Sequence, residues 1–170
     1  MNLKKLFILI LSTFLLIYYF YPEEKLNKNI KIDKIIVYKS KNKMYVYSKG
    51  KIQKVYKISI GRNSIGKKEF EGDKKTPEGK YTINDKNPNS GYYKNLGISY
   101  PNSNDLNYAK KLGEPAGGEV KIHGLRNYFG CIGNFHRFFN WTLGCIAVTN
   151  WEMEELYQSV EVGTQIEIKP

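Results

Sequence analysis

The chain has 170 residues, enough for one domain with a single hydrophobic core and little more. Hydrophobic residues make up 41% and aromatic residues 14% of it, which is typical of a globular domain and excludes a disordered chain. The formal net charge of +11 favours anionic surroundings, such as phospholipid headgroups or acidic polymers. The lysines are scattered, with no aromatic-plus-arginine stacking pattern, so we do not expect nucleic acid as a partner.

Residues 1–22 are built like an export signal. Lys4 and Lys5 precede a run from Leu6 to Tyr21 that is almost entirely apolar. Cleavage needs small residues in an Ala-x-Ala-like arrangement, and the sequence has no alanine before Ala109. We therefore expect an uncleaved signal anchor in the cytoplasmic membrane, although cleavage would make the protein secreted. The lysines keep the short N-terminus inside by the positive-inside rule, so the rest of the chain faces outward.

Residues 23–33 are charged and rich in Lys and Asn, which predicts a tether, and the folded domain is expected over residues 34–170. The start of this domain combines β-branched and aromatic residues in partial alternation, as strands do. Strands are expected at residues 34–40, 43–51 and 52–61. The sequence SKGK between the second and third strands predicts a hairpin turn. A loop with several glycines follows, and then a further strand candidate, Tyr81 to Ile83.

The stretch from Asn84 to Gly118 is predicted to be mostly loop. One modest helix is expected near Asp105 to Leu112, where Asn104 can cap the start and Gly113 the end. The sequence EVKIHG then alternates as a strand that ends on His123.

Short elements are also expected near the C-terminus. Cys145 to Val148 reads as a strand that follows a long aromatic loop. Thr149 and Glu152 have the spacing of a capping box, and the helix that they start carries its apolar residues on one face. A turn and a last strand close the chain. The sum is a mainly β domain with one or two short helices.

All the histidines and cysteines of the chain fall in one short region: His123, Cys131, His136 and Cys145. The residues alone leave four interpretations of Cys145. It can be a small buried hydrophobe, half of a disulfide with Cys131, a ligand of a Cys2His2 zinc site, or a nucleophile. The zinc spacings, H-x7-C-x4-H-x8-C, contain no close C-x2-4-C or H-x3-5-H pair.

A cysteine nucleophile needs a thiolate, a base within reach and donors for the developing oxyanion. His123 ends one predicted strand and Cys145 opens another, so adjacent strand ends can bring imidazole and thiol together. Gly144 lets substrate approach the backbone, and the Gly144 and Cys145 amides are candidate oxyanion donors. His136 is a rival base, but its aromatic surroundings favour a packing or substrate-wall role.

Four segments resemble the L,D-transpeptidase catalytic domain, also called the YkuD domain. They are GDKKTPEG (Gly72 to Gly79), IHG (Ile122 to Gly124), TLGCIAVTN (Thr142 to Asn150) and the closing VGTQIEI. Their order and approximate spacing are those of the family, and the resemblance runs from about Lys34 to Pro170. It implies the family's fold, with mixed sheets in a sandwich or barrel-like arrangement and one or two short helices.

The resemblance also implies roles for single residues. Cys145 matches the family's nucleophile, His123 matches its general base, and the carbonyl of Gly124 orients the imidazole. Further support of the cysteine motif is implied for Thr142, Gly144 and Asn150. Such enzymes attack the carbonyl of the third residue, a diamino acid, in a peptidoglycan stem tetrapeptide. The terminal D-alanine leaves, a thioester forms, and an amine on a neighbouring stem resolves it. No metal or other cofactor is implied.

The chain departs from the family at two positions beside the cysteine. Leu143 stands where many members carry a second histidine, and Ala147 where they carry an arginine that helps to shape the site. The aromatic loop of residues 128–141 is expected to form a wall or lid over the groove, or a satellite hydrophobic cluster. Either Arg126 or Arg137 can replace the missing charge. The candidate substrate-binding residues are Arg126, His136, Arg137 and Trp141.

The sequence thus predicts a membrane-anchored cysteine L,D-transpeptidase of the bacterial cell envelope, active in cell wall cross-linking or remodelling and so in cell shape. One alternative is an L,D-carboxypeptidase or hydrolase that uses the same acyl-enzyme with water as acceptor. Another is a non-catalytic wall-binding module whose basic surface holds anionic wall polymers. The expected partners are peptidoglycan stem peptides, anionic wall polymers, and the membrane through the N-terminal segment.

Overall fold

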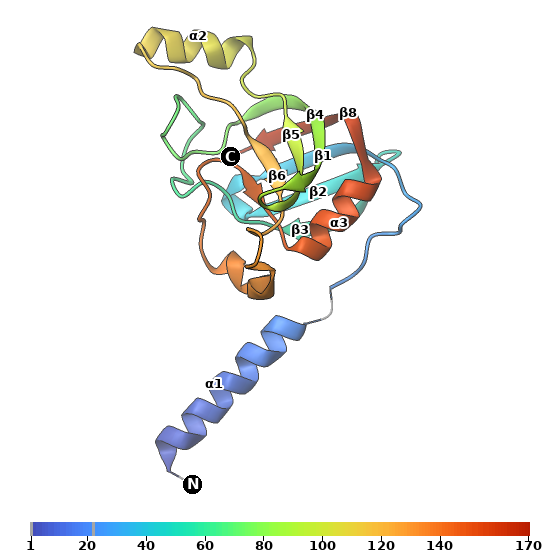
Figure 1. Cartoon of the computed structure of the whole chain (residues 1–170), viewed down its shortest axis with the longest axis vertical. Coiled ribbons are helices and arrows are strands. Elements are labelled where there is room, and N and C mark those ends of the chain that lie inside the picture. Colours follow the sequence, from blue (N-terminus) through green and yellow to red (C-terminus); the bar gives the residue numbers. More distant parts are fainter. Residues whose placement is uncertain (1, 22) are drawn as a thin grey trace.

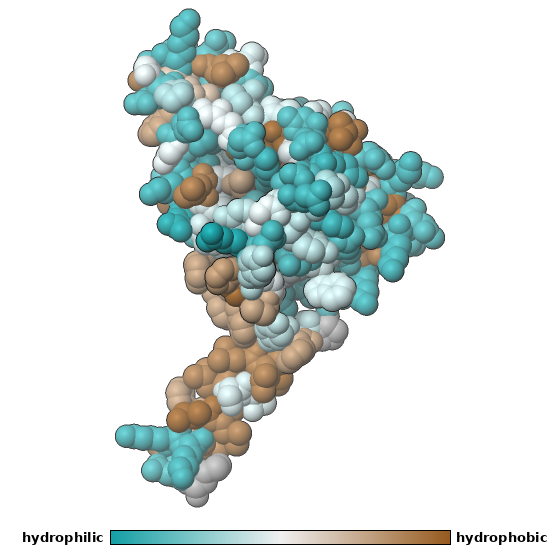
Figure 2. Space-filling model, in the orientation of Figure 1, coloured by the Kyte–Doolittle hydropathy of each residue, from teal (hydrophilic) through white to brown (hydrophobic). Residues whose placement is uncertain are grey.

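The structure is a computed structural model that describes residues 2–21 and 23–170. Helix α1 (Leu3–Phe20) projects away from the folded domain (Figure 1). It is long and apolar enough to cross a membrane, by length and composition. Figure 2 shows this apolar surface along most of the helix. It is the segment for which the sequence predicts a signal anchor.

Residues 23–33, expected to be a tether, partly pack against the domain. Leu26 is buried within the hydrophobic core, and its amide donates a hydrogen bond to Oε1 of Glu155 (3.2 Å). Ile30 packs against the same core, and the first strand starts at Ile32, two residues before the expected domain start. Single apolar residues in a polar stretch carry no periodic signal, so only their tertiary contacts place them in the domain.

Within the described residues, eight strands form one mixed sheet in the order β3-β2-β1-β8-β4-β5-β6-β7. The strands are β1 (Ile32–Tyr38), β2 (Lys43–Ser48), β3 (Lys51–Lys57), β4 (Gly79–Ser90), β5 (Tyr93–Ile98), β6 (Lys121–His123), β7 (Ile146–Ala147) and β8 (Val160–Lys169). The pairs β1/β8 and β6/β7 are parallel, and the other neighbours are antiparallel.

The sheet curls so that its two ends meet. Ser59 and Gly61, which follow β3 at one end, form bridges with Ala147 and Thr142 at the other end. The expectation of a mainly β, barrel-like domain is therefore confirmed. The curl also brings the segment after β3 against the loop that carries Cys145.

The core lies inside this curl. Alternate residues of β1 and β2, such as Ile35, Val37, Met44 and Val46, are fully buried, as expected for strands with one face on the core. Full burial of each such aliphatic side chain contributes about 1.5–3 kcal/mol.

Helices α2 (Ser103–Leu112) and α3 (Asn150–Ser159) begin with capping boxes. In α3 the box is formed by Thr149 and Glu152, as the sequence predicts. In α2 the N-cap is Asn102, so the prediction of Asn104 is wrong by two residues. Both side chains can cap, but Asn102 has Asp105 three residues later to complete the box. Two 3-10 segments, η1 (Lys39–Lys41) and η2 (Gly130–Phe138), complete the described elements.

The prediction of mostly loop from Asn84 to Gly118 is wrong for its first part. Strand β4 continues to Ser90, and β5 returns antiparallel to it, with register shifts along the pair. The sequence NDKNPNS at the end of β4 has low β propensity, because Asn, Asp and Pro disfavour strands. Pairing with β5 overrides that local preference.

Candidate active site

Strands β6 and β7 bring His123 and Cys145 to the same face of the sheet. Their parallel register pairs Ile122 with Ile146 and His123 with Ala147, and Cys145 directly precedes β7. Both isoleucines are fully buried in the core. Side chains alternate along strands, so His123 and Cys145 share the opposite face, and Cys145 stands two residues before Ala147, the partner of His123. The predicted meeting of two strand ends is what the topology provides.

The imidazole of His123 is held in one orientation. Its Nδ1 lies 2.6 Å from the carbonyl oxygen of Gly124, and a carbonyl only accepts, so Nδ1 carries the proton and Nε2 is left as a basic nitrogen. The ring is buried, which lowers the pKa of His123 to about 4. Tyr92 and Trp141 lie beside it, with ring centroids 4.6 and 5.8 Å from the imidazole. The imidazole is therefore neutral at physiological pH and able to accept a proton.

The Cys145 thiol lies in a partly buried position. Its Sγ is 3.5 Å from the carbonyl oxygen of Glu119, to which the thiol can donate. Burial raises the pKa of Cys145, and a hydrogen bond from the Lys121 amide only partly opposes that effect. Both Cys145 and Cys131 are free thiols, so the interpretation as a disulfide is not the state of this structure. Within residues 2–21 and 23–170, no group of three or more His, Cys, Asp or Glu side chains is placed to hold a metal ion.

Thr142 shapes the loop that carries the cysteine. Its buried Oγ1 donates to the carbonyl of Cys145 (2.8 Å) and accepts from the amide of Gly144 (3.1 Å). The Gly144 amide, expected as an oxyanion donor, is thus engaged within the loop. The Cys145 amide remains the candidate donor.

Both the backbone conformation and the surroundings at position 144 require a glycine. Its φ is +135°, and a Cβ placed there would lie 2.8 Å from the carbonyl oxygen of Lys75. Lys75 belongs to the GDKKTPEG segment, where Asp73 accepts hydrogen bonds from its neighbours and Thr76 Oγ1 accepts one from the Gly61 amide. This segment therefore supports the loop that carries Cys145.

Asn150 supports the chain segment that follows His123. Its Oδ1 accepts from the amide of Leu125 (2.8 Å), and a Cβ on Gly124 would lie 2.7 Å from that oxygen. The first residue of α3 therefore holds the segment whose Gly124 carbonyl orients His123.

The candidate substrate-binding residues fall into two groups. Arg126, His136 and Trp141 line a cavity of about 650 Å³, with Leu125 and the aromatic residues of η2. His136 is buried there: Ser59 Oγ donates to its carbonyl (2.9 Å), and its Nδ1 lies 3.5 Å from Trp141 Nε1. Burial lowers the pKa of His136 to about 3. This position fits the predicted packing or wall role and does not place His136 as the base.

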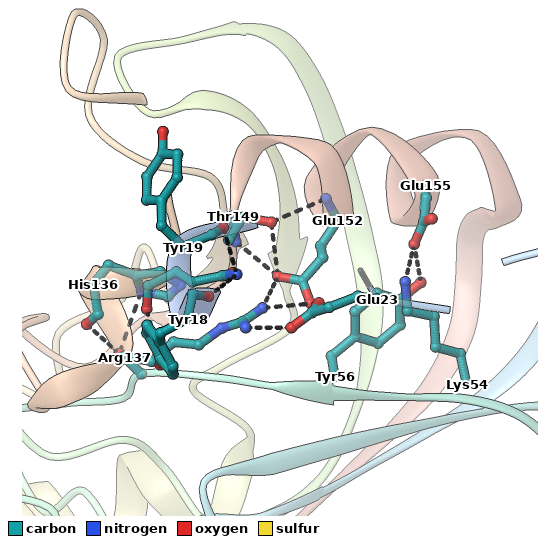
Figure 3. A network of polar contacts seen from close by, with 12 residues as sticks. Tyr18, Tyr19, Glu23, Lys54, Tyr56, His136, Arg137, Thr149, Glu152 and Glu155 are labelled. Carbon is teal, nitrogen blue, oxygen red and sulfur yellow. Dashed lines mark hydrogen bonds and ion pairs between the residues drawn. The ribbon is translucent and has the colours of Figure 1, made fainter. Parts of the chain in front are cut away.

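Arg137 stands apart from that group. Its side chain is 5% exposed and forms ion pairs with Glu23 (2.5 Å) and Glu152 (2.7 Å). Figure 3 shows the guanidinium between the two carboxylates. The prediction that Arg137 offers its charge to substrate does not agree with this geometry. Arg126, whose side chain is exposed, keeps that candidate role.

Tyr92 lies in the candidate site, and the sequence interpretation missed it. It stands at the turn between β4 and β5, in the stretch predicted to be loop, and its ring packs on His123. A hairpin signal there, from Gly91 after a polar run, was the available clue.

Known proteins resemble this chain in sequence and in structure. The family model of the L,D-transpeptidase catalytic domain, YkuD, matches residues 32–168. YafK of Escherichia coli (strain K12), provisionally named an L,D-transpeptidase, is 33% identical over 107 residues, which cover 62% of this chain and 36% of YafK. YqjB of Bacillus subtilis (strain 168), provisionally named in the same way, is 28% identical over 135 residues, covering 78% of this chain and 68% of YqjB.

The crystal structure of Pgp2 from Campylobacter jejuni, described as a helical cell shape determining protein, matches with a TM-score of 0.61 and 28% identity. The match covers 84% of this chain and 49% of Pgp2, so the chain spans about half of that protein, and its match covers about a third of YafK. A curled mixed sheet with cysteine and histidine on one face of neighbouring parallel strands defines the class of domain. Since the family model covers residues 32–168, the chain belongs to the L,D-transpeptidase (YkuD) family.

Proposed function

We propose that this chain is a peptidoglycan L,D-transpeptidase that transfers stem peptides through a thioester on Cys145, with His123 as the general base. The observation that carries the proposal is the pair itself. His123 and Cys145 lie on one face of neighbouring strands, and the bond from Nδ1 to Gly124 leaves Nε2 of the imidazole able to take the thiol proton.

In the proposed reaction, Sγ of Cys145 attacks the carbonyl of the third stem residue while its proton passes to Nε2 of His123. The C–N bond to the terminal D-alanine breaks, and the imidazolium returns the proton to the leaving amine. A thioester remains. The amine of a neighbouring stem then attacks, its proton passes to His123, and the C–S bond breaks to restore the thiol.

The electrostatics of the pair support a neutral resting state. The pKa of the thiol is raised and that of the imidazole lowered to about 4, so at neutral pH the proton stays on sulfur. Proton transfer then accompanies attack on the substrate. The amide of Cys145 is the proposed oxyanion donor, and one such donor contributes about 2.7–4 kcal/mol in other enzymes.

The position of the enzyme is part of the proposal. Helix α1 would anchor it, with Lys4 and Lys5 on the cytoplasmic side and the catalytic domain outside, where peptidoglycan lies. The likeness to Pgp2 supports a role in cell shape through remodelling of the wall.

In the decisive experiment, the full-length protein in detergent is incubated with a disaccharide tetrapeptide. The mass of the intact protein and the reaction products are then measured. We expect an acyl adduct on the protein and release of D-alanine. The Cys145→Ser variant should form no thioester adduct, whereas the matched Cys131→Ser variant should react like the parent. In the same assay His123→Asn should lose more adduct formation than His136→Asn.

The products separate the alternatives. A cross-linked dimer supports transfer, and a tripeptide without dimer supports the carboxypeptidase or hydrolase alternative. If the protein binds wall fragments but neither adduct nor D-alanine appears, the chain is a wall-binding module and the proposal fails.

A further inference from the structure

Segment η2 and its flanks expose an unusually apolar surface, which we call the insertion face and define as Phe129, Ile132, Phe138 and Phe139. Their exposed fractions are 51%, 39%, 58% and 67%. Large aromatic side chains that remain this exposed and adjacent mark an interaction surface rather than scattered surface residues. These four side chains also line the cavity that Arg126 and Trp141 share, and that role does not account for their exposure.

The insertion face is continuous with helix α1. Phe135 and Phe138 of η2 stack on Tyr18, with centroids 5.8 and 5.0 Å apart, and Phe135 also packs on Tyr19. The hydroxyl of Tyr19 donates to the carbonyl of Cys131 (2.8 Å). Figure 2 shows the apolar surface of α1 continuing onto the adjoining part of the domain, where Figure 1 places η2.

The level of these contacts along α1 places η2 in the membrane interface. Leu15 lines the same cavity as Phe129, Phe138 and Phe139. Leu15 precedes the last residue of α1 by five positions, or about 7.5 Å of helix. The helix has 18 residues, about 27 Å, so a membrane-spanning α1 needs its whole length for the hydrocarbon core. Residues that share a cavity with Leu15 then lie at or below the outer boundary of that core.

Polar contacts at the C-terminal end of α1 set the orientation of the domain relative to this helix. Arg137 pairs with Glu23, just past the helix, and also with Glu152 at the start of α3. Asn134 Nδ2 donates to the carbonyls of Tyr18 and Tyr19, both at 3.4 Å. These contacts fix the domain against the end of α1, so one defined side of the domain would face a bilayer that α1 spans.

We propose that the insertion face is a membrane-docking surface whose partner is the outer leaflet of the phospholipid bilayer that α1 spans. Aromatic side chains favour this interfacial level, with rings among the upper acyl chains. Trp141 and Arg126 line the cavity beside the face, and Trp141 packs near His123, so docking would hold the reacting site at the bilayer surface. The inference rests on the membrane-anchoring role of α1 in the proposed function.

The test measures membrane depth in the full-length protein reconstituted in phosphatidylcholine–phosphatidylglycerol vesicles. Cys131→Ser and Cys145→Ser remove the native thiols, and a nitroxide is attached at Phe139→Cys on the insertion face. The matched control carries it at Leu106→Cys on α2, a position that is 52% exposed, on the helix that lies at the end of the domain away from α1 (Figure 1). At 139 we expect oxygen to collide with the nitroxide more often than a water-soluble nickel complex does. At 106 the order should be reversed.

Three outcomes overturn the inference, and carbonate extraction of the same vesicles distinguishes the first two. If the chain stays in the membrane but the label at 139 is as accessible to nickel as that at 106, α1 anchors and the face does not dock. If carbonate releases the chain, the anchoring role fails and takes the inference with it. Strong dipolar broadening between labels at 139 would assign the face to a second copy of the chain instead.

Discussion

The reaction proposed for the site depends on the protonation states of His123 and Cys145. In the structure, Nδ1 of His123 is committed to the Gly124 carbonyl, and the Cys145 thiol faces the carbonyl of Glu119. Neither contact stabilises a thiolate. A preformed thiolate–imidazolium pair is therefore not the resting state that these residues favour, and the proposed reaction requires the arrangement that substrate completes.

A first prediction concerns alkylation of Cys145 in the Cys131→Ser background. Because the pKa of the thiol is raised and that of His123 is lowered to about 4, the thiolate fraction should be small at neutral pH and grow as pH rises into the alkaline range. The measurement is the iodoacetamide rate against pH. The same titration of Cys131 in the Cys145→Ser variant supplies the reference. A plateau in the rate from about pH 5 to pH 8 would instead reveal an ion pair and contradict this picture.

At the scale of elements, three chain segments meet at one edge of the sheet and form the candidate site. Strand β6 ends on His123, the loop before β7 carries Cys145, and the GDKKTPEG segment closes against that loop at Gly144. Asn150, at the start of α3, holds the chain just beyond His123. The approach at Gly144 is between two backbone segments, and Asn150 adds a side-chain contact to the backbone, so small displacements of the loop change the position of the thiol.

A second prediction follows for Gly144→Ala. The residue has φ +135°, and its new Cβ would meet the Lys75 carbonyl at 2.8 Å, so the loop must shift. We expect a loss of about 1–3 kcal/mol of stability from backbone strain, together with loss of adduct formation. Urea unfolding and the mass assay measure the two effects. Gly118→Ala is the matched control, since that glycine has open space around it and should be close to neutral. Equal behaviour of the two variants would refute the role given to Gly144.

At the scale of the whole molecule, one buried cation joins three parts of the chain. Arg137 lies in η2, Glu23 follows the N-terminal helix, and Glu152 belongs to the capping box of α3 (Figure 3). Burial raises the pKa of Glu152, and the charge of Arg137 opposes this effect. The network couples η2, the segment that follows α1 and helix α3.

The third prediction is that Arg137→Met destabilises the protein strongly. It leaves two carboxylates without their cation, and breaking a buried ion pair costs about 3–5 kcal/mol. Urea unfolding of the full-length protein measures the loss. Arg126→Met, whose side chain is exposed, should stay within about 0.5 kcal/mol of the parent and act instead on substrate KM. A stable Arg137→Met variant with a raised KM would return Arg137 to the substrate-binding role.

Local patterns were sufficient for several elements and for naming a candidate pair of reacting residues. The strands β1 to β3 are recognisable from β-branched and aromatic alternation, and α3 from its capping box, because these signals lie within a few neighbouring residues. His123 and Cys145 could be proposed from motif spacing. Strand β5 and the end of β4 could not, since their polar residues become a hairpin only through pairing.

The sequence by itself determined the family, the apolar N-terminal helix, the mainly β domain and the candidate nucleophile and base. Tertiary structure alone decided that Arg137 is buried in an ion-pair network, that the Gly144 amide is used by Thr142, that Leu26 belongs to the core, and that η2 packs on α1. The physical reason is the separation along the sequence between the residues that determine each feature. Propensities, caps and motifs are encoded among near neighbours, whereas the burial and partner of a charge depend on residues that only the fold brings together, as Glu23 and Arg137 are.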